Sequence, residues 1–147
     1  AMQSLVSPAL NLLYIDDQQN IGYLGVGKIP LRGRGQGMTP VPAWDESAGW
    51  RGFIPSDQMP QINNPESGYI VSANNRMFAD DYPYFVSEDW AEPERAQRIE
   101  QLIQEKVASG HPLSIEDHKA IQMDTLDLEA RALLTEFAAV TPEDDEM

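Results

Sequence analysis

Residues 11–27 carry the pattern of a β-hairpin. An apolar run covers residues 12–15, the polar residues 16–20 follow, and a second apolar stretch interleaved with glycine covers residues 21–26. Two short apolar runs joined by a polar turn are typical of sequential antiparallel strands. Further along, the β-branched and aromatic residues 69–72 predict a short strand that ends at an asparagine pair, a residue type that favours turns.

Residues 27–65 lack a regular period because glycine and proline recur along them. Such a composition predicts an ordered loop without long helices or strands. Three large aromatic residues lie in this loop: Trp44, Trp50 and Phe53. Leaving them in water is unfavourable, so we expect them to pack against a neighbouring segment.

The period becomes helical after residue 90. Pro93 suits the first turn of a helix, and the apolar residues that follow it recur every three to four positions until Gly110 and Pro112. Ser114 and Asp117 resemble a capping box and predict a second helix through Ile121 and Met123. The apolar residues of a predicted third helix are Leu126, Ala130, Leu133, Leu134 and Phe137.

This order of elements predicts an α+β fold in which antiparallel strands are followed by an α-helical segment. We treat residues 1–147 as a single piece, with a strand and loop part at 1–75 and a helical part at 90–140. Residues 141–147 are polar and acidic, and we expect this tail to be frayed.

The charge of the chain excludes some classes of partner. It has 147 residues with 24 acidic and 10 basic side chains, a net charge of -14 and a pI near 4.3. Such a surface opposes binding to nucleic acids and to anionic membranes. No run approaches the roughly 20 apolar residues of a membrane span. The chain has no cysteine, which excludes disulfides and thiolate metal sites.

Four ordered blocks of the sequence resemble the β chain of penicillin acylases, which are amide hydrolases of the N-terminal-nucleophile class. The blocks are NIGYLGVGKIPLR (20–32), PVPAWDESAGWRGFIPSDQMPQINNP (40–65), GYIVSANNRMFADDYPYFVSEDWAEPERAQRI (68–99) and, more weakly, LSIEDHKAIQMDTLDLEARALL (113–134). The resemblance implies that the chain is part of the αββα sandwich of that class.

The resemblance also implies what this chain would lack. The family's nucleophile is the first residue of the mature β chain, usually serine, and it would lie upstream of Ala1. We therefore expect a fragment that is inert alone and whose partner is the remainder of the acylase, with an acyl amide as substrate (a β-lactam side chain or an acyl-homoserine lactone). The family implies no required cofactor and a periplasmic or secreted location.

Two residues match family positions that act on the substrate. Asn74 matches the asparagine whose side-chain amide stabilises the oxyanion, with its neighbour Asn75 as the alternative. Arg95 matches an arginine that orients the asparagine and the substrate. Composition alone would make the asparagine pair a turn cap and Arg95 a solvated helix residue. We predict that Arg76 and Arg98 are solvated surface residues.

Asp81, with Asp80, is a candidate ligand for the structural calcium that several penicillin acylases hold, since carboxylates suit this hard cation. The alternative is a turn and helix-capping pair. His111 and His118 lack the partners that zinc or a catalytic dyad needs. Four aromatic residues border either an acyl pocket or a core: Tyr82, Tyr84, Phe85 and Trp90.

Two alternatives to an enzyme fragment stay open. The chain could be a non-catalytic acidic α+β module that binds a protein through its tryptophan-bearing loop. Strands removed from a larger sheet also expose edges, so we expect self-association of the fragment as a dimer or aggregate.

Overall fold

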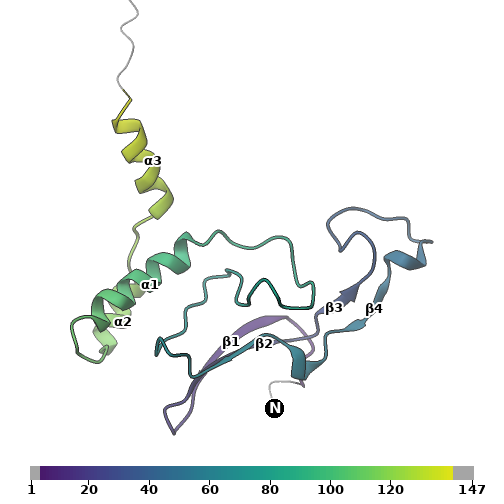
Figure 1. The fold of residues 1–147 in the computed structure, drawn as a ribbon, viewed down its shortest axis with the longest axis horizontal. Coiled ribbons are helices and arrows are strands. Elements are labelled where there is room, and N and C mark those ends of the chain that lie inside the picture. Colours follow the sequence, from purple (N-terminus) through teal and green to yellow (C-terminus); the bar gives the residue numbers. More distant parts are fainter. Residues whose placement is uncertain (1–3, 141–147) are drawn as a thin grey trace, which may run out of the picture. The chain divides into compact units, whose positions relative to one another are not determined.

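The computed structural model describes residues 4–140, so the predicted frayed tail lies outside the described residues. The chain divides into two compact units, residues 1–91 and residues 92–147. Strands occupy the first unit and α-helices the second, which confirms the α+β class (Figure 1). The division falls where the sequence pattern changes from strand-like to helical.

The predicted hairpin is present. Strand β1 (Leu10–Ile15) runs antiparallel to β2 (Ile21–Val26), in an uninterrupted register from Leu10↔Val26 to Ile15↔Ile21 (Figure 1). Asp16 closes the turn because its Oδ1 accepts hydrogen bonds from the backbone N–H groups of Gln18 at 2.9 Å and Asn20 at 2.8 Å. The Asn20 side-chain amide donates to the same carboxylate, and this bond, together with the two from the backbone, lowers the pKa of Asp16.

A third strand that the sequence did not predict completes this sheet. Strand β5 (Gln61–Asn63) pairs antiparallel with β2, so the strand order is β1-β2-β5. Asn64 fastens its end: Oδ1 accepts from the backbone of Ile21 at 2.9 Å, and Nδ2 donates to Oδ1 of Asn20 at 2.8 Å. The central strand is therefore held on both sides.

The buried apolar side chains of the described residues all lie in the first unit. They are Tyr23, Val26, Ile54 and Met59, each no more than 5% exposed. The Tyr23 hydroxyl donates to Asn11 Oδ1 at 2.9 Å, and burial raises the pKa of Tyr23. Burying one such side chain contributes about 1.5–3 kcal/mol, so this small core is anchored on β2 and on the loop that leads to β5.

The loop at 27–65 contains no long element, but it includes short elements that the composition concealed. Strands β3 (Pro30–Arg32) and β4 (Trp50–Phe53) form a second, two-stranded sheet, and single 3-10 turns lie at Glu46–Ala48 and Ser56–Gln58. Trp44 is 85% exposed. Trp50 is 63% exposed and packs edge-on against Phe53, with ring centres 6.1 Å apart, so the expected packing is only partly present within residues 4–140.

The predicted strand at 69–72 is wrong. The segment has no strand ladder and meets β1 through a side-chain hydrogen bond, from Asn11 Nδ2 to Ser72 Oγ at 3.2 Å. A strand requires a backbone partner, and a favourable residue composition does not supply one.

Three helices form the second unit: α1 (Glu94–Val107), α2 (Ile115–Gln122) and α3 (Leu128–Ala138) (Figure 1). Pro93 precedes α1 with φ of -73°, and Gly110 with φ of +76° lies beyond its end. The predicted capping box is present, since Ser114 and Asp117 bond each other's backbone N–H. Leu126 lies before α3.

Charge pairs connect the helices of the second unit. Arg98 on α1 makes a two-pronged bond to Asp124, with distances of 2.9 and 2.7 Å, and Lys106 lies 2.8 Å from Asp117 on α2. No described residue of these helices is buried. Among residues 4–140, no helix combines the length and the apolar character of a membrane span.

Candidate functional site

Asn74 has an unusual backbone conformation. Its φ is +65°, in the left-handed region that residues with a Cβ rarely adopt, and the residue is exposed within the turn at 73–75. Asparagine is among the residues that tolerate this region best, but the conformation still costs about 1–3 kcal/mol and persists only where the surroundings hold it.

Hydrogen bonds on both sides hold this turn. Asn75 Oδ1 accepts from the backbone N–H of Ala73 at 2.9 Å, and the Asn74 carbonyl accepts from the backbone N–H of Ala91 at 3.2 Å. The Asn75 amide donates to the Arg76 carbonyl at 3.3 Å and contacts Met77 Sδ at 3.7 Å. The Asn75 side chain therefore bonds to the backbone of the turn itself.

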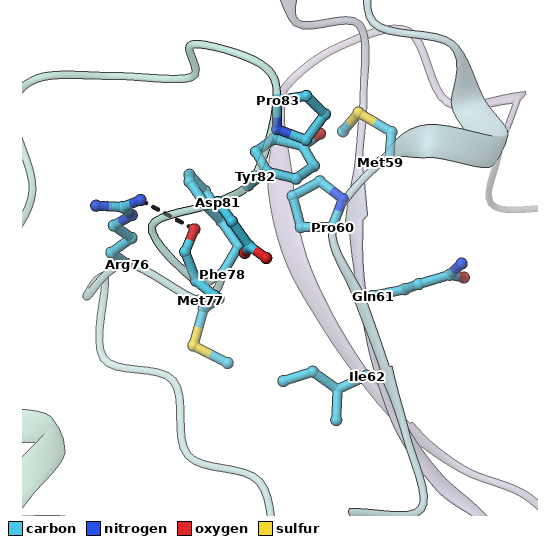
Figure 2. A pocket seen from close by; sticks show the side chains of 11 residues that line it. Met59, Pro60, Gln61, Ile62, Arg76, Met77, Phe78, Asp81, Tyr82 and Pro83 are labelled. Atoms are coloured by element: carbon cyan, nitrogen blue, oxygen red, sulfur yellow. Dashed lines mark hydrogen bonds between the residues drawn. The ribbon is translucent and has the colours of Figure 1, made fainter.

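An open groove of about 790 Å³ begins directly after this turn, between residues 59–62 and residues 76–83 (Figure 2). Its apolar lining includes Met59, Ile62, Met77, Phe78 and Tyr82. At one rim, Arg76 donates to the Ala79 carbonyl at 3.0 Å, which is the bond drawn in Figure 2. The groove therefore combines an apolar lining with a charged rim.

An aromatic cluster supports the groove. The ring of Phe78 lies 4.6 Å from that of Tyr82 and 5.5 Å from that of Trp90, and the Tyr82 ring lies 5.8 Å from that of Tyr84. The Tyr82 hydroxyl donates to the Gln58 carbonyl at 2.9 Å, and burial raises the pKa of Tyr82. The rings are half-buried, so they act both as core and as groove wall.

The two neighbouring aspartates, Asp80 and Asp81, make different contacts near the groove. Asp80 pairs with Arg76 at 2.9 Å while its side chain is fully exposed, and Asp81 lines the groove. Within residues 4–140 no third acidic or histidine side chain gathers with them into a metal-binding group. Because Ca²⁺ takes six to eight oxygen ligands, the described residues alone do not fit it.

Arg95 lies in the first turn of α1, in the second unit, and is exposed. It borders a smaller groove of about 380 Å³ together with acidic side chains of the same unit. Asn74 and Arg95 thus belong to different units.

Two arginines expected to be solvated have specific partners. Arg98 makes the bond to Asp124, and its side chain is only 18% exposed. Besides its contact with Asp80, Arg76 places its guanidinium 4.9 Å from the centre of the Phe78 ring. The solvated interpretation is confirmed for Arg76, which is exposed, but it was wrong for Arg98, because the partner of Arg98 lies 26 residues away and is not visible in its local sequence.

The turn role that composition favours for the asparagine pair is confirmed for Asn75. A local signal existed, because asparagine side chains commonly bond nearby backbone groups in turns. The contribution of Ala91 could not have been found, since its backbone N–H carries no sequence signature.

Comparison with known proteins identifies the family of the chain. The sequence model of the penicillin amidase family matches residues 1–147. Penicillin acylase 2 proenzyme of Pseudomonas sp. (strain SE83) is 40% identical over 116 residues, which are 79% of this chain and 14% of that protein. Acyl-homoserine lactone acylase QuiP of Pseudomonas syringae pv. syringae (strain B728a) is 35% identical over 130 residues, 88% of this chain and 15% of that protein.

A solved structure shows the same fold. The thermostable penicillin G acylase from Alcaligenes faecalis aligns with a TM-score of 0.64 and 26% identity, over 95% of this chain and 25% of that chain. The chain therefore spans a small part of each relative named here. With a family match over its whole length, the chain belongs to the penicillin amidase family.

Proposed function

We propose that this chain is part of an amidohydrolase that cleaves linear acyl amides, such as a penicillin side chain or an N-acyl-homoserine lactone. Support comes from the family match and from relatives named as penicillin and acyl-homoserine lactone acylases. The proposed nucleophile is an N-terminal serine outside this chain. The chain alone is then inert, and the rest of the acylase is its partner.

The proposed reaction has two steps. The serine Oγ attacks the amide carbonyl carbon and its proton passes to the serine α-amine, after which the C–N bond breaks and the amine leaves with a proton. Water then attacks the resulting ester, and the carboxylic acid is released as the serine recovers its proton. Each step passes through a tetrahedral oxyanion that requires hydrogen-bond donors.

In this proposal Asn74 supplies one donor, through its side-chain Nδ2. The observation that carries the proposal is the exposed left-handed turn of Asn74, whose carbonyl is tied to Ala91. A preorganised donor needs no rearrangement when charge develops, and one such donor contributes about 2.7–4 kcal/mol to the rate. Arg95 would orient Asn74 and the substrate through its fork of N–H donors.

Exposed apolar side chains in each unit support a proteinaceous partner. Trp44 and Trp50 are exposed in the first unit, and Leu134 and Phe137 on α3 are 68% and 67% exposed in the second. Large exposed rings are common at protein interfaces. A periplasmic or secreted location, and a calcium held by Asp81 together with oxygens from outside this chain, are part of the same proposal.

The test is amide hydrolysis by the longer protein that carries this sequence, with phenylacetyl and long-acyl chromogenic amides. We expect Asn74→Ala to lower kcat by about 100-fold or more. Gln19→Ala is the matched control because Gln19 has the same φ of +65° in an exposed turn of the same unit. Equal rates for Asn74→Ala and wild type would remove Asn74 from the oxyanion site.

A further inference from the structure

We propose that Asn75 is a positioning residue that holds Asn74 in its left-handed conformation and thereby sets the direction of the Asn74 amide. The proposal rests on the function proposed for Asn74. It assigns to Asn75 no contact with the substrate.

The hydrogen bonds of Asn75 bracket its neighbour. Its Oδ1 accepts from Ala73, the residue before Asn74, at 2.9 Å, and its Nδ2 donates to Arg76, the residue after itself, at 3.3 Å. One planar amide group thus connects the backbone on both sides of Asn74. A turn fixed at both ends leaves the residue between with little freedom to return to the favoured negative-φ region.

A second connection leads to the groove. The Asn75 amide also lies 3.7 Å from Met77 Sδ, and Met77 lines the groove between residues 59–62 and 76–83 (Figure 2). The same side chain therefore contacts the turn that bears the proposed donor and the wall of the adjacent apolar groove. A shift of Asn75 would change both together.

Other asparagines show what the arrangement at 73–75 adds. Asn64 also has a positive φ, of +45°, but its own side chain makes the bonds that fasten β5. At the 73–75 turn the bracketing bonds come from the neighbour.

The first test is a double-mutant cycle in the longer protein. Asn75→Ala is expected to lower kcat about 10-fold or more with KM changed less than threefold, and to lower it no further when added to Asn74→Ala. Asn75→Ser should recover part of the rate because a serine hydroxyl forms similar, weaker turns. Additive losses, or an unchanged kcat in Asn75→Ala, would overturn the proposal.

The second test does not depend on activity. Hydrogen exchange and backbone chemical shifts of the 147-residue chain are measured for Asn75→Ala and Asn75→Ser. We expect faster exchange at the Ala73 amide and a shift change at residue 74, with α1 and β1 unchanged. Unchanged values at 73 and 74 overturn the proposal even if a variant of the longer protein fails to fold. Asn74→Ala could have full activity while the Asn75 variants change the exchange at Ala73 and the chemical shift at residue 74. In that case the function proposed for Asn74 fails and the positioning role of Asn75 stands.

Discussion

The two units of this chain are held together by different kinds of interaction. In the first unit four buried apolar side chains and a set of asparagine and aspartate bonds to the backbone fix the shape, and all four non-glycine residues with positive φ among residues 4–140 lie there. In the second unit no described residue of the helices is buried, and ion pairs and helix caps carry the structure. Unusual backbone geometry is therefore found where a core supports it.

The largest effect should come from the core of the first unit. Tyr23→Ala removes a ring that is 4% exposed and its bond to Asn11, so we expect a loss of about 3–5 kcal/mol. Unfolding is followed by near-ultraviolet circular dichroism for the aromatic residues and at 222 nm for the helices. Phe137→Ala, at a ring 67% exposed, is the control. A parallel loss of both signals would show that the units unfold together.

Acid should weaken the second unit. Hydrogen bonds from Lys106 and Ser114 hold the pKa of Asp117 far below 3.8, and Arg98 lowers the pKa of Asp124. A lowered carboxyl pKa stabilises the fold above the ordinary value and loses this contribution as the pH falls. We expect helicity to be constant from pH 7 to about 5 and to fall below about pH 4.

Asp124→Asn is the matched variant for this titration because it keeps the shape of the side chain and removes its charge. Its helicity should depend less on pH than that of the wild type. A wild-type helix signal that persists unchanged to pH 2 would contradict a role for these pairs.

A smaller effect is expected at the cap of α2. Ser114→Ala removes the hydroxyl that accepts from the Asp117 backbone N–H, which should lower stability by about 1 kcal/mol, measured by urea unfolding at 222 nm. Thr135→Ala, on α3, is the control, since its hydroxyl bonds a carbonyl within a formed helix. Equal effects of the two variants would mean that the capping box does not fasten the start of α2.

The smallest change in stability, within about 0.5 kcal/mol, is expected for Ile15→Lys on β1, where the side chain is 72% exposed. Its effect should instead be on self-association. The edge strand Leu10–Ile15 has no charged side chain, and a lysine on such an edge opposes pairing with another chain. Light scattering should show a dimer or aggregate for the wild type and a smaller species for the variant. A monomeric wild type at high concentration would contradict the expectation.

Local patterns predicted the elements that local interactions determine. The β1 and β2 hairpin, the three helices and the Ser114 capping box follow from periodicity and turn chemistry within a few residues. Strand β5 was missed because its partner β2 lies some forty positions earlier, and the strand at 69–72 was wrong because composition does not create a partner. At the site, the sequence motif indicated Asn74. The hydrogen bond from the Ala91 backbone N–H to the Asn74 carbonyl could not be predicted, because it depends on the folded backbone.

The way in which Asn64 fastens β5 has a consequence for the order of folding. The β1 and β2 hairpin closes a turn of a few residues, which chains do within microseconds, whereas β5 can join β2 only after residues 27–60 have closed into a loop. Closing a longer loop has a larger entropic cost. Pairing the three residues of β5 offsets only a small part of that cost. We therefore expect β5, with the two hydrogen bonds of Asn64 to Ile21 and Asn20, to join the sheet after the hairpin has formed.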